Sequence, residues 1–134
     1  MEVADYSKNL IVCPNQWLIY NQRCYFISEE KRTRDQSWQY CKSQGAALLT
    51  INDKKELDVI TALLDKNSYY WIGLSCSMES TLIWDDKTPL QTNLFYKYCY
   101  TEYCFAFGLY SEYKHSCYQS ERWICEKAST QIQI

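Results

Sequence analysis

Apolar residues fall into short runs along the chain, and the most apolar run covers residues 69–74. It reads Tyr-Tyr-Trp-Ile-Gly-Leu and has polar residues on both sides. Its length and aromatic content are typical of a strand that is buried on both faces. Gly73 inside the run indicates that another backbone or a bulky ring comes close at that point. We therefore expect Trp71 and Leu74 to lie in the core.

The segment that begins at Thr33 has the signals of a first helix. Thr33 and Gln36 have the spacing of a capping box, and Gly45 supplies the stop. Trp38 and Cys41 are three residues apart, so they share one face of the helix. This spacing places Cys41 toward the interior.

A second helix is predicted from Asp53 onward. Asp53 is the expected N-cap, with Glu56 as its capping-box partner. The apolar stripe of this helix consists of Leu57, Ile60 and Leu64. Its solvated face is expected to carry Lys54, Lys55 and Asp58.

Several shorter apolar runs predict strands. Two of them, 18–20 and 23–27, are separated by the polar pair Asn21 and Gln22, which predicts a hairpin. The other candidate strands are 46–51, 82–84, 105–107 and 122–126. Two early helices followed by several strands predict an α+β fold in which the helices flank a mostly antiparallel sheet.

The cysteine content indicates an oxidising compartment. The chain has 134 residues and eight cysteines, an even number that is typical of a small disulfide-stapled domain. Zinc is disfavoured because no pair has Cys-x-x-Cys spacing and His115 is the single histidine. The net charge of −2 offers no basic patch for nucleic acid.

The apolar runs are too short for a membrane span, and no signal peptide opens the chain. Together with the expected disulfides, this suggests the extracellular part of a longer protein, with its anchor or leader outside this sequence. We expect residues 1–12 to form a tether or stalk remnant, 13–127 the folded domain and 128–134 a tail.

Catalysis finds no support in the sequence. A general base near neutral pH is most often a histidine. His115 lies in a turn rich in tyrosine and lysine, with Glu112 as the nearby acid, and an exposed loop histidine is the favoured interpretation. The chain has three glycines, too few and too scattered for a phosphate-binding loop. We expect no enzymatic activity.

Tyrosines concentrate between residues 95 and 118, where they alternate with charged residues. Tyrosine offers a large contact area at low entropic cost and is enriched where proteins bind proteins. The segment is therefore the predicted partner-binding face, although the tyrosines could instead merely cover a glycine-poor sheet. The residues assigned to that face are Tyr96, Tyr98, Tyr100, Tyr110, Glu112, Tyr113 and Lys114.

The landmarks of the chain, taken in order, resemble one family. They are Cys13-Pro14-x-x-Trp17 with Cys24-Tyr25, Leu48-Leu49-x-Ile51 with Glu56-Leu57, Trp71-Ile72-Gly73-Leu74, and Trp123-Ile124-Cys125-Glu126. This pattern, over 13–127, resembles the C-type lectin-like domain, and more narrowly its natural killer and myeloid receptor branch. Within the branch it is similar to both the myeloid inhibitory C-type lectin-like receptor group and the early activation antigen group.

The resemblance implies three disulfides, namely Cys13–Cys24, Cys41–Cys125 and Cys104–Cys117. Cys76 and Cys99 have no counterpart in the basic pattern of the family. Both fall between the central apolar run and Cys104, and an oxidising compartment disfavours idle thiols, so we expect them to pair with each other. In the alternative, Cys99 links two chains, and Cys76 stays unpaired or also becomes intermolecular.

Two positions depart from the family pattern. The family usually has Trp at the opening of its first helix, where this chain has Arg34, and Trp38 is expected to fill that volume from one turn later. The Asp-Gly turn that follows the family's Trp-x-Trp reads Asp85-Asp86-Lys87 here, so the glycine is missing.

The calcium ligands of the sugar-binding members are missing as well. The family supplies them from Glu-Pro-Asn or Gln-Pro-Asp, and from Trp-Asn-Asp shortly before the cysteine that matches Cys117. Here Pro89 has no ligand on either side, and residues 112–114 read Glu-Tyr-Lys. A lysine ammonium in place of a carboxylate repels the ion. We expect no metal and no cofactor, and we expect Asp85 and Asp86 to form a solvated turn.

The sequence thus predicts a calcium-independent recognition ectodomain of a type II immune-cell receptor. Its expected ligand is a protein on another cell surface, with a homodimer as a further open arrangement. A secreted or viral decoy of the same fold is one alternative. A calcium-independent binder of glycans or of crystalline small molecules is another.

Overall fold

The computed structural model describes residues 1–6, 9–88, 90, 99, 104–108, 112–115 and 117–133. The described helices are α1 (Arg34–Ser43) and α2 (Lys54–Thr61). The strands in these ranges are β1 (Glu2–Tyr6), β2 (Asn9–Cys13), β3 (Leu18–Tyr20), β4 (Arg23–Ile27), β5 (Ala47–Leu48), β6 (Tyr70–Trp71), β7 (Leu74–Cys76), β8 (Leu82–Trp84), β9 (Cys104–Phe107), β10 (Glu112–His115), β11 (Arg122–Ala128) and β12 (Thr130–Gln133).

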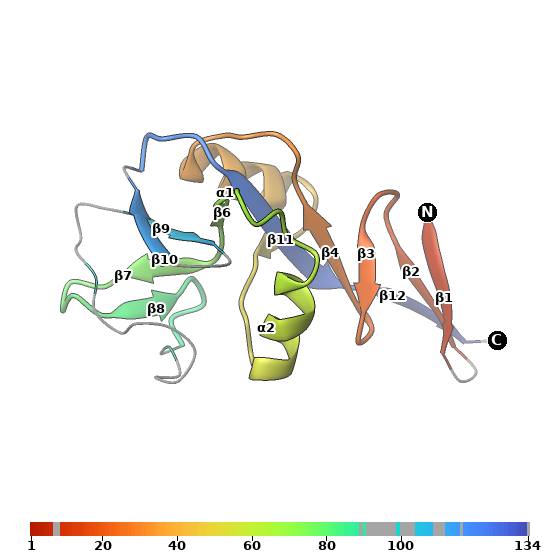
Figure 1. Cartoon of the computed structure of the whole chain (residues 1–134). Helices are drawn as coiled ribbons and strands as arrows, with labels where there is room; N and C mark the ends of the chain where they lie inside the picture. Colours follow the sequence, from red (N-terminus) through yellow and green to blue (C-terminus); the bar gives the residue numbers. More distant parts are fainter. Residues whose placement is uncertain are drawn as a thin grey trace.

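Strand β11 is the centre of the main sheet, whose order is β10-β9-β6-β11-β4-β3, with β5 also paired to β11. The β11–β6 pair is parallel, and the other pairs of this sheet are antiparallel. Figure 1 shows α1 and α2 on opposite sides of β11. The predicted α+β arrangement, with two helices flanking a mostly antiparallel sheet, is confirmed.

The core forms two clusters that use alternate residues of β11. Trp123 and Cys125 belong to the cluster that includes Cys41 of α1, whereas Ile124 belongs to the cluster that includes Leu57 and other residues of α2. Successive side chains of a strand point to opposite faces. Each helix therefore covers one face of β11.

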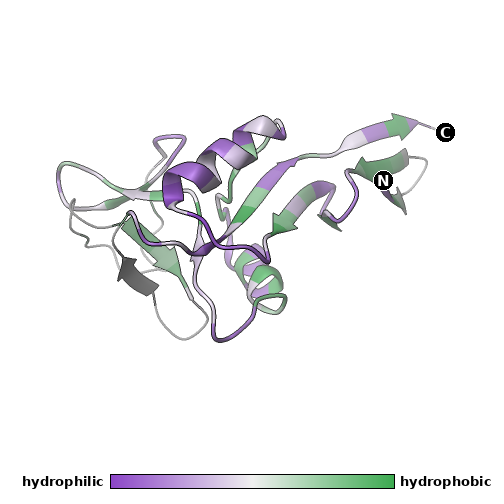
Figure 2. Cartoon of the chain, turned by 90° about the horizontal axis from the view of Figure 1, so that it is seen from above, coloured by the Kyte–Doolittle hydropathy of each residue, from purple (hydrophilic) through white to green (hydrophobic). Residues whose placement is uncertain are grey.

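Helix α1 begins and ends where its local signals predict. The Gln36 backbone N–H donates to Thr33 Oγ1 at 3.3 Å, and the Thr33 N–H donates to Gln36 Oε1 at 3.2 Å. Gly45 has φ +68°, the left-handed conformation that ends a helix. Cys41 is fully buried as expected. The helix is predominantly hydrophilic outside that contact, as Figure 2 shows from above.

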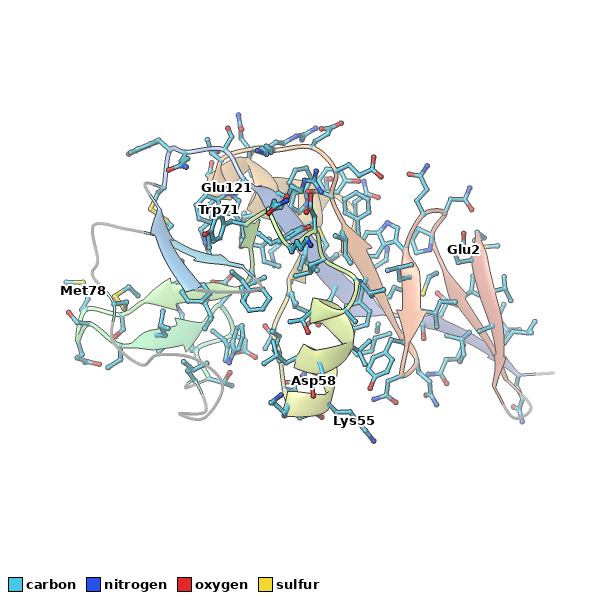
Figure 3. All side chains as sticks on the ribbon, in the orientation of Figure 1. Glu2, Lys55, Asp58, Trp71, Met78 and Glu121 are labelled. Carbon is cyan, nitrogen blue, oxygen red and sulfur yellow. A yellow bond between two sulfur atoms is a disulfide. The ribbon has the colours of Figure 1, made fainter. Side chains whose placement is uncertain are left out.

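Helix α2 has the predicted N-cap and a different partner for Glu56. The Glu56 N–H donates to Asp53 Oδ1 at 2.8 Å. Glu56 Oε1, however, accepts from the N–H of Asn52 at 2.8 Å, so the expected capping box with Asp53 is wrong. The predicted stripe (Leu57, Ile60 and Leu64) is buried, and Lys54, Lys55 and Asp58 are exposed. Figure 3 shows Lys55 pointing away from the domain at the lower end of α2.

The most apolar run is not one strand but two. β6 ends at Trp71 and pairs with β11 and β9, whereas β7 starts at Leu74 and pairs with β8. Between them the Gly73 N–H donates to the carbonyl of Leu49 at 2.8 Å. A Cβ at Gly73 would lie 2.9 Å from that carbonyl oxygen, which explains the glycine. Trp71 and Leu74 are fully buried, as predicted.

The other predicted strands form, with some changes of length. The hairpin of β3 and β4 turns at Asn21 and Gln22, which have φ +50° and +66°. Such positive φ values are what a two-residue hairpin turn requires. The candidates 82–84, 105–107 and 122–126 correspond to β8, β9 and β11. Only residues 47–48 of the candidate 46–51 pair as a strand, β5.

The two ends of the chain form strands, in contrast to the tether and tail expected there. β1, β2 and β12 make a three-stranded antiparallel sheet at the end of the molecule where both termini lie (Figure 1). Ile132 lies opposite Leu10, and Ile11 is buried. These apolar residues, which are far apart in sequence, stabilise the pairing of β2 with β12, and no local sequence signal predicts that pairing. The domain limits at residues 13 and 127 stay a prediction.

Four disulfides staple the fold: Cys13–Cys24, Cys41–Cys125, Cys76–Cys99 and Cys104–Cys117. These are the pairs that the sequence analysis expects. The second of them joins α1 to β11, and so fixes the helix on the central strand across 84 residues of sequence.

Candidate partner-recognition site

Most of the predicted partner-binding face lies outside the described residues. Tyr96, Tyr98, Tyr100 and Tyr110 belong to the undescribed part. Glu112, Tyr113 and Lys114 lie in β10, whose backbone pairs with β9 but whose side chains are not described. The tyrosine-rich face therefore stays a prediction. The described residues define the scaffold to which it is attached.

That scaffold is the end of the molecule away from both termini. Figure 1 shows β7, β8, β9 and β10 together at this end, whereas the N- and C-termini lie at the other. Strand β9 is anchored through its pairing with β6 and through the burial of Phe105 and Phe107. The β9–β10 pair thus extends the main sheet at this edge.

The Cys76–Cys99 disulfide attaches residue 99 to the hairpin of β7 and β8 at this end of the molecule. Cys99 is 9% exposed, and its N–H donates to the Ser80 carbonyl at 3.2 Å. Met78, in the turn between β7 and β8, is 93% exposed and lies at the tip of the molecule in Figure 3. Residue 99 is thereby held against a hairpin that projects into solvent.

Arg34 connects α1 to the same end. Its side chain is 17% exposed, and Nη2 lies 3.3 Å from the Ile72 carbonyl, 3.2 Å from the Leu74 carbonyl and 3.1 Å from Asp85 Oδ1. The guanidinium therefore joins the junction of β6 and β7 to the turn after β8. The expected substitution by Trp38 is wrong, because Trp38 is 40% exposed and lies on the solvent side of α1.

The Asp85–Asp86 turn is already occupied by contacts within the chain. Asp85 pairs with Arg34 and also accepts a hydrogen bond from the Ser75 hydroxyl at 3.0 Å. Asp86 Oδ1 accepts from the Thr88 hydroxyl at 2.6 Å and from the Thr88 N–H at 2.9 Å, and these bonds hold the pKa of Asp86 below its usual range. Lys87 has φ +73°, the conformation that a glycine would adopt here without strain.

Among the residues that the structure describes, no three metal-ligating side chains converge on one point. His115 lies opposite Cys104 in the β9–β10 register, and its side chain is outside the described set.

An acidic network that the sequence analysis missed lies beneath α2. Glu126 of β11 is almost fully buried, with Arg23 Nη2 at 3.4 Å. Burial raises the pKa of Glu126 to about 7, against the lowering effect of Arg23. Nearby, the Tyr25 hydroxyl donates to Glu56 Oε2 at 2.7 Å. The available signal was the period-2 alternation of β11, which puts Glu126 on the same face as the buried Ile124.

Comparison with known proteins identifies the family of this chain. Residues 30–127 match the Lectin C-type domain, and the chain belongs to that family. Its relatives place it in the natural killer and myeloid receptor branch. Natural killer cells antigen CD94 of Homo sapiens is 34% identical over 119 residues, which are 86% of this chain and 65% of that protein. Killer cell lectin-like receptor subfamily F member 1 of Macaca fascicularis is 30% identical, over 92% of this chain and 55% of that protein.

Solved structures agree on the C-type lectin fold. The C-type lectin domain of murine dendritic cell inhibitory receptor 2, in complex with N-glycan, superposes with a TM-score of 0.76 at 24% identity, over 87% of this chain and 99% of that one. A calcium-independent type II antifreeze protein superposes with a TM-score of 0.74 at 24% identity, over 90% of this chain and 97% of that one.

The chain spans between about half and two thirds of the length of the curated relatives it matches. In the described residues, no helix is both long and apolar enough to cross a membrane.

Proposed function

We propose that this domain recognises a protein, or another ligand displayed on a surface, without calcium and without catalysis. The observation that carries the proposal is the two-ended layout of the molecule. The chain termini lie together at one end, and the strands that hold the tyrosine-rich segment lie at the other (Figure 1). A receptor attached through a terminus would present the second end outward.

Calcium independence is supported by the chemistry of the described acidic turn. A calcium site needs several oxygen ligands that converge on the ion, with carboxylates to offset its dehydration. Asp85 is neutralised by Arg34, and Asp86 accepts two hydrogen bonds from Thr88. At residues 112–114 the sequence offers Tyr113 and Lys114 where the family has ligands.

The proposed setting is the extracellular side of the plasma membrane of an immune cell, with a type II anchor that belongs to a longer protein. Four disulfides suit an oxidising compartment. The names of the relatives, a natural killer cell antigen and killer cell lectin-like receptors, support the cell type. The proposed partner is a cell-surface protein. A homodimer of the chain is a further arrangement, and sedimentation would detect it.

The test is an alanine scan of the tyrosine-rich face. A ligand is first isolated by screening multimers of the folded domain against cells. Tyr96, Tyr98, Tyr110 and Tyr113 are then changed singly to alanine, and the dissociation constants are measured. We expect at least one variant to weaken binding by more than about 1 kcal/mol, roughly fivefold in Kd.

The matched control is Leu18→Ala, which removes an exposed apolar side chain from β3, far from this face. It should leave the dissociation constant unchanged. If all four tyrosine variants bind like the unmodified domain, or if Leu18→Ala weakens binding as much, the face is elsewhere.

A further inference from the structure

A row of aromatic rings crosses the flank of the molecule between β4, α1 and β11. Phe26 is its centre: its ring centroid lies 5.6 Å from that of Trp17, 5.4 Å from that of Tyr40 and 6.2 Å from that of Trp123. Tyr40 and Trp123 contact each other edge-on at 5.3 Å. This flank is separate from the β7–β10 end to which the proposed function assigns the ligand.

Both ends of the row already carry cations of the chain itself. The Lys127 ammonium lies 5.0 Å from the ring centroid of Trp17. The Arg32 guanidinium lies 5.6 Å from that of Tyr40 and 5.4 Å from that of Trp123. The faces of aromatic rings attract cations through their quadrupole. Phe26, between the two ends, has no such cation among the described residues.

An open cavity of about 440 Å³ adjoins this central ring. Its lining includes Phe26, Tyr40, Trp123 and two exposed carboxylates, Glu29 and Glu30. Glu30 is paired with Arg32 at 3.1 Å, so these two charges offset each other. Glu29 lines the same cavity, and it forms no ion pair with any residue that the structure describes.

A second hollow, of about 370 Å³, shares Arg32 and Tyr40 with the first and extends along α1. Its other lining residues are Gln36, Gln39 and Ser43, all neutral hydrogen-bonding side chains. The two hollows together offer an aromatic and acidic recess for a cationic group, with polar space beside it for the chain that bears that group.

We propose that this recess docks an arginine side chain of a partner protein, with its guanidinium over Phe26 and paired with Glu29. Arginine fits better than lysine because its guanidinium is flat, weakly hydrated and able to stack on a ring while it binds a carboxylate. Arg32 is the internal precedent, since its guanidinium lies over two rings and pairs with Glu30 in the same cavity.

The wall of the recess contains its own spectroscopic reporter. The Trp123 indole N–H is buried and has no hydrogen-bond acceptor in the described structure. The rings of Phe26 and Tyr40 lie close to Trp123, so a group that moves them changes the ring-current shift of this indole proton. The chain has five tryptophans. The Trp71 indole N–H donates to the Arg32 carbonyl at 2.9 Å, so it is coupled to the recess, whereas Trp38 and Trp84 line neither hollow and their indole resonances show whether a ligand acts elsewhere.

The experiment is an NMR titration of the oxidised domain with N-acetyl-arginine amide, up to about 50 mM because a contact of one side chain is weak. The comparison probe is N-acetyl-citrulline amide, which has nearly the same shape and no charge. We expect the arginine compound to shift the indole resonances of Trp17 and Trp123 at least three times more per unit concentration than the citrulline compound. Glu29→Gln should reduce the arginine effect at least twofold.

The matched control is Glu79→Gln, at an exposed glutamate in the turn between β7 and β8, which should leave the titration unchanged. Both substitutions affect exposed side chains, so both variants are expected to fold. Equal shifts with citrulline, shifts confined to Trp38 and Trp84, a full response in Glu29→Gln or an equal loss in Glu79→Gln would each overturn the proposal. These outcomes do not depend on the ligand of the tyrosine-rich face.

Discussion

Arg34 is a charged residue whose role in the fold depends on its burial. Its guanidinium donates to the carbonyls of Ile72 and Leu74 and pairs with Asp85. Removal of a buried donor leaves its acceptors without a partner, which costs more than the bond itself gains. Arg34 therefore stabilises the point where the most apolar run of the chain changes sheets.

The first prediction compares the truncation of one arginine, Arg34, with that of one lysine, Lys54. Arg34→Ala should lower the free energy of unfolding by about 2–3 kcal/mol, because two carbonyls lose the guanidinium donor and Asp85 loses its ion-pair partner. Lys54→Ala, which breaks the exposed helical pair with Asp58, should cost less than about 0.5 kcal/mol. Denaturant unfolding of the oxidised proteins measures both. Equal losses would contradict the bridging role of Arg34.

Glu126 makes the stability of the domain dependent on pH. In the folded state burial raises its pKa to about 7, whereas an unfolded glutamate titrates near 4.3. Between these values the folded state binds more protons than the unfolded state. The stabilisation is therefore fully present below about pH 4.3 and is lost as the pH rises through about 7.

The second prediction replaces that carboxylate with a neutral amide. Glu126→Gln should be more stable than the unmodified domain at pH 8, by about 1–3 kcal/mol, because it removes a charge that burial disfavours. The difference should shrink toward pH 5, where Glu126 is protonated. Denaturant unfolding across this range measures it, with Glu79→Gln as the exposed control. A difference that stays constant with pH would show that the carboxylate does not titrate there.

At the scale of elements, the helices and the hairpin were predictable because their signals are local. Thr33 and Gln36 bond to each other's backbone, and Gly45 adopts the left-handed conformation at the helix end. Asn21 and Gln22 tolerate the positive φ of the hairpin turn. Each of these signals acts within a few residues, so the sequence order contains it.

Apart from the partner of Glu56, which is Asn52 and not the adjacent Asp53, the errors fell where the cause is distant in sequence. The run 69–74 divides because the Leu49 carbonyl binds the Gly73 N–H, a contact across 24 positions. Strands β2 and β12 pair from opposite ends of the chain. The buried site of Glu126 and the aromatic recess combine residues from separate segments, so periodicity within one segment could not locate them. The tyrosine-rich face stays a prediction.

The third prediction concerns the disulfide between Cys76 and Cys99. The two cysteines are 23 residues apart in sequence. For a loop of that length the chain-entropy model gives a stabilisation of the folded state by about 3 kcal/mol. The double variant Cys76→Ser, Cys99→Ser should lose about that amount of unfolding free energy. Non-reducing peptide mapping should recover the two cysteines in one linked fragment. A free Cys76 thiol, or a dimer that reduction splits, would favour the intermolecular alternative.

At the scale of the whole molecule, the two ends have different tasks in our proposal. The terminal sheet of β1, β2 and β12 lies with both termini, and the β7–β10 end lies opposite (Figure 1). The Arg34–Asp85 pair is at the second end, so the carboxylate of Asp85 is already bound to a cation of the chain itself. The recognition that we propose therefore does not use a metal ion.

The fourth prediction is that calcium leaves the stability of the domain unchanged. An ion that binds only the native state must raise the unfolding temperature as its concentration rises. Thermal unfolding in millimolar calcium and in chelator should give the same midpoint. A clear increase with calcium would show a site that the acidic turn does not provide.

The most direct test of calcium-independent recognition measures binding itself. Multimers of the oxidised domain are added to cells that bind it, in buffer with calcium and in buffer with chelator, and bound fluorescence is measured over a range of concentrations. We predict saturable binding with the same half-saturation in both buffers. Loss of binding in chelator, recovered when calcium is restored, would contradict the account.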